Sequence, residues 1–131
     1  MYAFKLKTNY KECLINITDK IRMYTNDNRF KSGILTIFTP HTTAAVTINE
    51  NSDPDVKTDI IYFLNKYIPS LKEFKHFEGN SDAHIKSTLV GCSETIIIEN
   101  SQLILGTWQS IYFCEFDGPR ERKVYLKFIG D

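Results

Sequence analysis

Three histidines are the residues of this sequence most capable of chemistry. His41 lies between two apolar segments, and His76 and His84 bracket a short polar stretch. Three neutral imidazoles together with a water or a substrate can form a catalytic metal site of the zinc type. The spacing of eight residues between His76 and His84 matches no recognised ligand motif. Three unrelated loop histidines are therefore the alternative interpretation.

A second polar cluster extends from Asn49 to Asp55 and is rich in side chains with oxygen ligands. Carboxylates and water are the ligands that Mg²⁺ prefers, so this segment is a candidate magnesium site. The alternative is helix capping, which explains Asp53 and Asp55 at the start of a helix. Capping explains Asn49 and Glu50 less well, because they end an apolar strand.

A third cluster begins at Gly106 and includes Thr107 and Gln109. In an extended strand, Gln109 and Glu115 would share an otherwise apolar face, which is unusual for simple packing and suits the lining of a site. The alternative is that they belong to a solvated surface.

Basic residues near these clusters could bind an anion. Arg120 and Arg122 follow a tight turn and suit a phosphate or carboxylate clamp. Lys86 lies close after His84 and could add an anion contact. For all three residues, exposure to solvent is the alternative interpretation.

The composition limits the classes of partner. The chain has 131 residues, which fits one domain over residues 1–131. Its 16 basic residues balance its 16 acidic residues, so nucleic acid and anionic membranes are not expected as partners. Three widely spaced cysteines argue against a disulfide framework, and no signal peptide is visible, so a cytoplasmic location is expected.

Hydrophobic periodicity predicts more strands than helices. Alternating or continuous apolar residues predict strands at 2–7, 13–17, 33–39, 43–49, 95–98, 103–116 and 123–128. Helices are predicted after Thr18, from Pro54 to Tyr67 with Asp53 as the cap, and from Asp82 to Val90. The later strands are linked by hairpin turns. The expected fold class is α+β, a single compact domain with a mostly antiparallel sheet and two or three helices.

The same clusters carry a resemblance to a known family. Thr39-Pro40-His41-Thr42-Thr43 continuing to Asn49-Glu50, the segment from His76 through Gly79-Asn80 to Ser87, and Leu105-Gly106-Thr107-Trp108-Gln109 continuing to Arg120 resemble three blocks of the YjbQ-like family. The match runs in order from about Gly33 to the end of the chain. The sequence is therefore similar to YjbQ-like proteins over most of its length.

The resemblance implies a function and a set of site residues. The family is similar to enzymes with secondary thiamine-phosphate synthase activity, which join a hydroxymethylpyrimidine diphosphate to a thiazole phosphate and release diphosphate. It implies a small phosphorylated substrate, a homotrimer and a divalent metal, zinc or magnesium. The expected catalytic residues are His41, Glu50, Gln109 and Arg120; the expected metal ligands are His41, His76 and His84; the expected substrate-binding residues are Thr42, Thr43, Asn49, Asn80, Lys86, Thr107, Glu115 and Arg122.

Two other functions remain open at this point. The same histidines could hold zinc in a metal-dependent hydrolase of unknown substrate. A non-enzymatic trimeric protein could instead use them to hold a ligand or to stabilise contacts between subunits.

Overall fold

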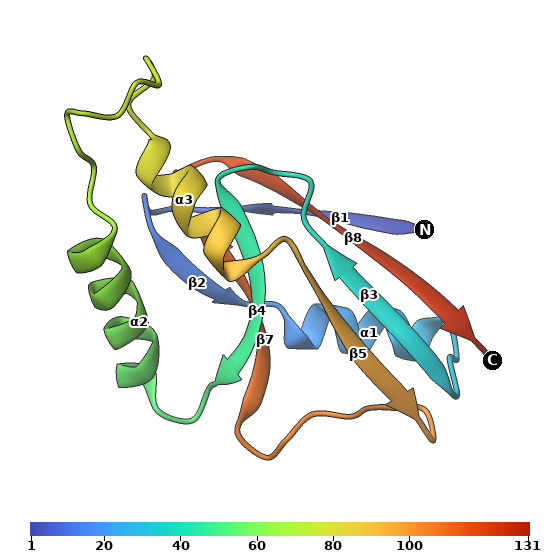
Figure 1. The fold of residues 1–131 in the computed structure, drawn as a ribbon. Coiled ribbons are helices and arrows are strands. Elements are labelled where there is room, and N and C mark those ends of the chain that lie inside the picture. Colours follow the sequence, from blue (N-terminus) through green and yellow to red (C-terminus); the bar gives the residue numbers. More distant parts are fainter.

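The computed structural model describes residues 1–131 as an α+β domain with two antiparallel sheets and three helices (Figure 1). The larger sheet has the strand order β1 (Tyr2–Lys7), β8 (Glu121–Gly130), β3 (Gly33–Phe38), β5 (Ser93–Glu99) and β6 (Gln102–Leu103). The smaller sheet has the order β2 (Cys13–Asn16), β7 (Gln109–Glu115) and β4 (Ala44–Glu50). The predicted fold class is confirmed.

The main core lies between the two sheets. Leu35, Ile37 and Leu126 of the larger sheet meet Val46 and Phe113 of the smaller sheet, and all five are completely buried. Alternate residues of a strand point to opposite faces, so the neighbouring residues of β4 and β7 face away from this core. The smaller sheet is therefore covered on both faces, which explains its continuous run of apolar residues.

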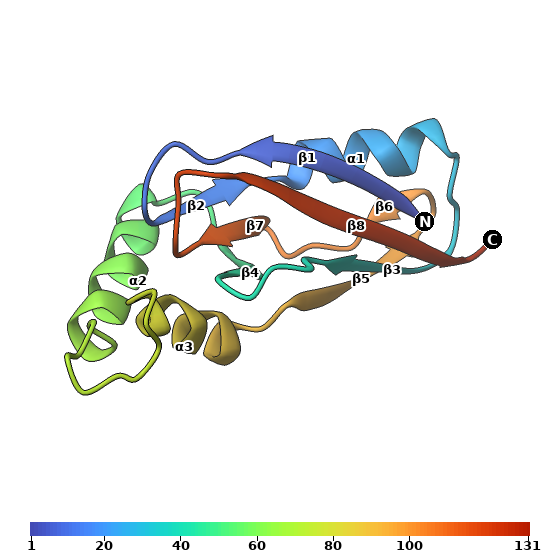
Figure 2. The same cartoon turned by 90° about the horizontal axis from the view of Figure 1, so that it is seen from above.

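The helices cover only part of the molecule. Helix α1 (Thr18–Asp27) places Ile21 in the main core. Helix α3 (Ser81–Val90) packs Ala83 against Ala45 and Cys114, on the other face of the smaller sheet. No helix covers the outer face of the larger sheet (Figure 2). The helices are too short or too polar to traverse a lipid bilayer.

Helix α2 (Pro54–Tyr67) begins as the sequence predicts, because the Asp53 side chain accepts the Asp55 N–H at 2.9 Å and Pro54 occupies the first turn. None of its residues is buried, however, and Phe63 and Tyr67 are exposed. Leu64 packs at the edge of the cluster formed by Ala45, Ala83, Cys114 and Phe116, so the contact of α2 with the rest of the chain is only partial.

The predicted strand over residues 103–116 is wrong in one respect. Its two ends belong to different sheets, since β6 pairs with β5 and β7 pairs with β4. Residues 104–108 form the connection between them, with a turn at Thr107 and Trp108. A continuous β-rich sequence does not reveal where a chain leaves one sheet for another, because both parts have the same period.

Candidate functional site

The site is built where the chain crosses between the two sheets. The β3–β4 and β7–β8 connections both pass from one sheet to the other, and the pairing of Ala44 with Glu115 brings them to the same end of the domain. Figure 1 shows these connections at the top of the molecule, beside the first turn of α3. Residues from three separate parts of the chain therefore meet here.

A polar cavity of about 390 Å³ lies at this meeting point and has no hydrophobic residue in its lining. We call it the histidine cavity. The residues that line it are Pro40, His41, Thr42, Thr43, His76, Glu78, Asn80, His84, Asp117, Arg120 and Arg122. All three histidines and both arginines predicted as site residues are brought together. The convergence on which the sequence-based hypothesis depended is present in the single chain.

His41 is held in a neutral form. Its Nε2 accepts a hydrogen bond from the Lys123 backbone N–H at 2.9 Å, which leaves the proton on Nδ1 as a donor for a ligand. Burial lowers the pKa of His41, and the charges of Arg122, Arg120 and Lys123 lower it further, against the opposing effect of Glu115. Protonation at Nε2 would also break the bond to Lys123, so this ring is suited to donating a hydrogen bond at neutral pH.

Arg120 is positioned by Asp117. Its Nε donates to the Asp117 carbonyl at 2.6 Å and its Nη2 to the Asp117 carboxylate at 2.8 Å. The same carboxylate accepts the Asn80 side-chain amide at 2.8 Å. The Asn80 Oδ1 is buried and has no hydrogen-bond partner, so a donor on a ligand would remove an energetic cost here.

Arg122 and Glu115 form a buried ion pair under the cavity. Arg122 donates to both carboxylate oxygens of Glu115 and to the Thr43 hydroxyl at 2.9 Å. Thr8 donates to the same carboxylate at 2.7 Å. Burial alone would raise the pKa of Glu115, but the hydrogen bonds from Arg122, from Thr8 and from the Asp117 N–H hold it below its ordinary value. Glu115 therefore stays charged and fixes the position of Arg122, rather than lining the cavity.

His76 and His84 lie side by side, with their ring centroids 5.4 Å apart in an edge-to-face arrangement. His76 Nε2 is 3.9 Å from the Glu78 carboxylate. No hydrogen bond to protein restrains the ring of His84, so its nitrogens are free to form hydrogen bonds with a ligand.

The cavity does not present a ready three-histidine metal centre. No group of three or more His, Cys, Asp or Glu side chains is arranged to hold a metal ion. The bond from Lys123 occupies the Nε2 lone pair of His41, and neutral Nδ1–H is a donor rather than a ligand. The metal ligands predicted from the sequence are close together, but their nitrogens are not directed at one point.

Four predicted residues lie elsewhere in the chain. Glu50 pairs with Gln109 at the opposite end of β4 and β7 from Ala44 and Glu115, which corresponds to about 20 Å at roughly 3.3 Å per residue. The Gln109 side chain accepts the Gly106 N–H at 2.7 Å, and Asn49 Oδ1 accepts the Glu50 N–H at 2.7 Å. Asn49, Glu50, Thr107 and Gln109 therefore do not line the histidine cavity within one chain.

The position of Lys86 contradicts both its expected role as an anion contact and the alternative of solvent exposure. It is neither exposed nor part of the cavity: its side chain is 1% exposed, and its Nζ donates to Glu12 at 3.0 Å and to Asn65 at 2.6 Å. Lys86 is on the side of α3 that faces α2 and the β1–β2 connection. Its role is to join these segments, and it supplies no anion contact in the cavity.

Three polar residues of the site, Glu78, Asp117 and Thr8, were absent from the predicted set. Asp117 orients Arg120 and Asn80, and Thr8 donates to Glu115 and accepts the Arg120 N–H at 2.9 Å. The spacing of Asp117 and Arg120 in a turn was a visible signal for an ion pair. Thr8 gave no signal, because its contacts join residues more than 100 positions apart.

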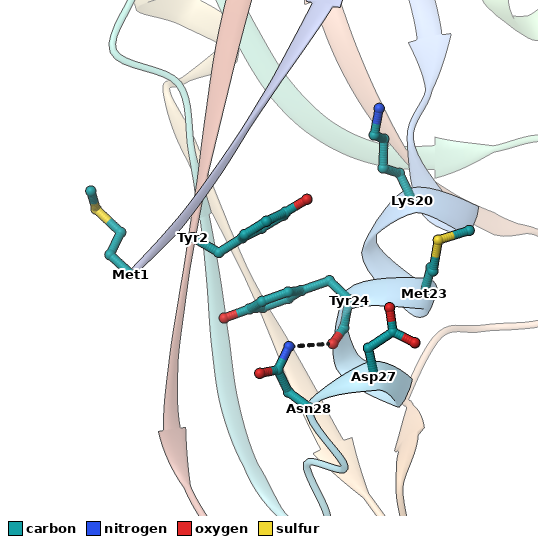
Figure 3. A pocket seen from close by; sticks show the side chains of 7 residues that line it. All are labelled: Met1, Tyr2, Lys20, Met23, Tyr24, Asp27 and Asn28. Atoms are coloured by element: carbon teal, nitrogen blue, oxygen red, sulfur yellow. Dashed lines mark hydrogen bonds between the residues drawn. The ribbon is translucent and has the colours of Figure 1, made fainter.

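Another cavity, of about 470 Å³, lies near the N-terminus and is lined by Met1, Tyr2, Lys20, Met23, Tyr24, Asp27 and Asn28 (Figure 3). Tyr2 and Tyr24 stack on each other at 4.5 Å, which joins β1 to α1. None of the predicted site residues lies there, and the stacked rings leave no space between them for a ligand.

Comparisons with known proteins agree with this architecture. The family model described as "UPF0047 protein YjbQ-like" matches residues 2–131. A UPF0047 protein of Methanocaldococcus jannaschii is 56% identical over 131 residues, covering 100% of this chain and 95% of the relative. The UPF0047 protein YugU of Bacillus subtilis is 48% identical over 129 residues, covering 98% of each chain.

Solved structures show the same fold. An uncharacterized conserved protein of the YjbQ/UPF0047 family from Clostridium acetobutylicum superposes with a TM-score of 0.96 at 50% identity, covering 98% of this chain and 100% of that chain. A hypothetical protein from Aeropyrum pernix superposes with a TM-score of 0.94 at 36% identity, covering 99% and 98%. Since the match extends through all three histidine-bearing segments, the chain belongs to the YjbQ-like UPF0047 family.

Proposed function

We propose that this protein is an enzyme that acts on a small phosphorylated substrate in the histidine cavity. One observation carries the proposal: three histidines and Arg120, from separate parts of the chain, meet in a cavity without a hydrophobic residue. A plain structural surface has no need for such a convergence, whereas a site for a polar, charged substrate does.

Two groups of donors suit a phosphate. Arg120 is half-exposed and keeps N–H groups that Asp117 does not use. The Nδ1–H of His41 is a second donor. Donors fixed in advance stabilise developing negative charge without further reorganisation.

The two imidazoles of His41 and His84 have different roles in this proposal. His41 donates a hydrogen bond while neutral, and His84 exchanges a proton with the substrate. The proposed reaction is the one that the resemblance to secondary thiamine-phosphate synthases implies, in which diphosphate leaves as two heteroaromatic precursors are joined. Catalysis would then consist of positioning and charge stabilisation of the departing diphosphate.

In this proposal a divalent metal ion enters the site bound to the diphosphate of the substrate. A magnesium ion bound with a diphosphate would neutralise part of its charge. The occupied Nε2 of His41 favours this arrangement over a resident zinc held by three imidazoles.

The decisive experiment supplies the purified protein with both thiamine precursors and Mg²⁺ and measures thiamine phosphate. We expect product from the wild type and at least about a hundredfold less from His84→Ala, the usual scale for loss of an acid–base group. Lys66→Ala, a change at an exposed residue of α2, is the control. No product above the His41→Ala background would remove the synthase proposal.

Metal analysis separates the hydrolase alternative. Stoichiometric zinc that survives dialysis would favour a metal-dependent hydrolase. If alanine at His76 and His84 instead broke an assembly while ligand binding persisted, a non-enzymatic binding protein would be favoured.

A further inference from the structure

A further cavity, of about 420 Å³, adjoins the histidine cavity, and we call it the second cavity. The two share His41, Thr42 and His84, so these residues form the boundary between them. The rest of its lining comes from the end of α3 and the residues after it: Ser87, Thr88, Gly91 and Cys92. Both volumes fall in the range of small-molecule sites, roughly 300–1,000 Å³.

The second cavity differs in charge from the first. Apart from the two shared imidazoles it contains no ionisable side chain other than the Cys92 thiol. The histidine cavity contains two arginines and two carboxylates, and Arg120 keeps N–H groups that Asp117 does not use. These free donors suit an anionic group in the first cavity, and the lack of carboxylates and of basic side chains other than the shared imidazoles suits an uncharged group in the second.

Two of the three hydroxyl groups that line the second cavity, those of Ser87 and Thr88, present oxygen acceptors. Ser87 donates its hydrogen to the Ala44 carbonyl at 2.6 Å, and Thr88 donates to the His84 carbonyl at 2.9 Å. Each hydroxyl has one hydrogen, so both oxygens are left with lone pairs only. A ligand group that enters this cavity gains hydrogen bonds by donating them.

We propose that the two cavities form one bipartite site, which binds a phosphorylated compound whose other end is an uncharged group carrying hydrogen-bond donors. The phosphate lies against Arg120, the uncharged group lies against Ser87 and Thr88, and the imidazoles of His41 and His84 lie at the junction. This inference rests on the proposed function and adds the class of the substrate and the position of its non-phosphate part.

Cys92 provides a natural reporter for the second cavity. It is exposed, whereas Cys13 is half-buried and Cys114 is buried. Burial, with smaller effects of Cys13 and Glu94, raises the pKa of Cys114 to about 12, which suppresses its thiolate. Alkylation by iodoacetamide, followed at Cys92 by peptide mapping, measures access to this cavity directly.

Three probes separate the two parts of the site: methylphosphonate, benzylphosphonate and 4-aminobenzylphosphonate. We expect all three to bind by calorimetry and to lose binding in Arg120→Ala. Only the two ring-bearing probes should slow alkylation of Cys92, by about tenfold or more at saturation. The amino group should improve affinity by up to about tenfold over benzylphosphonate, the effect of one or two hydrogen bonds.

Two variants supply the matched comparison. Thr88→Phe fills the second cavity and should abolish the advantage of the ring-bearing probes while methylphosphonate still binds. Leu89→Phe, on the neighbouring exposed position of α3, should change nothing. Agreement of these results with protection of Cys92 would support the bipartite site.

The contrary outcomes are distinct. If a ring-bearing probe binds in an Arg120-dependent manner but Cys92 reacts at an unchanged rate, the bipartite site is refuted while phosphate binding at the first cavity stands. If no phosphonate binds, the bipartite site and the proposed function both fail.

Discussion

Glu115 and Arg122 bury opposite charges at the end of the core nearest the site. Their side chains are 0% and 3% exposed, and Glu115 accepts hydrogen bonds from several donors at once. Removing one partner of such a pair costs stability, because the other charge is left buried without a compensating charge. The pair therefore fixes the position of the β7–β8 connection. It also fixes two of the charges that act on the pKa of His41.

We expect Glu115→Gln to lower the free energy of unfolding at pH 7 by about 3–5 kcal/mol, because the charge of Arg122 would be left uncompensated. The folded-state pKa of Glu115 lies below its ordinary value. Its contribution is therefore complete above the unfolded-state pKa, about 4.3, and is lost as the pH falls through the folded-state value. Urea unfolding of both proteins should show curves that converge in acid.

Glu121→Gln is the control for that measurement. Glu121 pairs with Lys5 at 3.6 Å on the surface, with both side chains more than half exposed. Its replacement should change stability by less than about 1 kcal/mol. Equal losses in the two variants would contradict the assigned importance of the buried pair.

His41 should titrate below the ordinary histidine value of about 6.5 in the folded protein. The unfolded chain binds this proton more readily, so stability rises with pH between the folded-state and unfolded-state values and is constant above them. Arg120→Gln removes a charge that lowers this pKa and should raise it. NMR of the imidazole protons measures the shift, and Lys66→Gln, at an exposed residue of α2, should leave it unchanged. A titration above 6.5 in the wild type would contradict the neutral His41.

Helix α3 is held by Lys86, a charged residue inside the fold. Lys86 donates to Glu12 and Asn65 and lies 3.9 Å from Asp82. It thus connects α3 both to α2 and to the β1–β2 connection. Because α2 has no buried residue of its own, this contact is a principal restraint on its position.

We expect Lys86→Met to destabilise the protein by about 3 kcal/mol or more, since Glu12 and Asp82 would lose their common partner. Hydrogen exchange should accelerate in α2 more than in the smaller sheet. Lys66→Met, which alters an exposed residue of α2, should have little effect on either measurement. Uniformly faster exchange throughout the protein would argue against a specific restraint on α2.

The surface of the whole molecule carries apolar residues that a single chain does not cover. Ile34, Ile97 and Ile129 project from the outer face of the larger sheet and are each about half or more exposed. A single chain therefore exposes an apolar face of the larger sheet. Contiguous apolar faces of this kind are characteristic of interfaces between subunits.

We expect the protein to form the homotrimer that the family resemblance implies, with the outer sheet face at its subunit contacts. Ile97→Glu would place a charge in that contact and should convert the assembly to monomers, measured by light scattering after size exclusion. Met23→Glu on α1, also exposed, should leave the mass unchanged. A monomeric wild type, or a trimer unaffected by Ile97→Glu, would contradict this arrangement.

The sequence alone was sufficient for the local structure and for much of the site. Alternating apolar residues identified the strands, and Asp53-Pro54 located the start of α2, because these signals depend on neighbouring residues. His41, His76, His84 and Arg120 were recognised from their residue types and confirmed as neighbours. Their resemblance to the YjbQ-like family agreed with the comparisons over the whole chain.

Only the tertiary structure decided which polar residues share a site. Glu50 and Gln109 looked equivalent to Glu115 and Arg120 along the chain, yet β4 and β7 extend between the two pairs and hold them at opposite ends. Lys86 looked solvated, but the packing of α3 buried it. Such placements depend on contacts between residues far apart in sequence, and a local pattern contains no information about which end of a strand, or which side of a helix, will meet a distant segment.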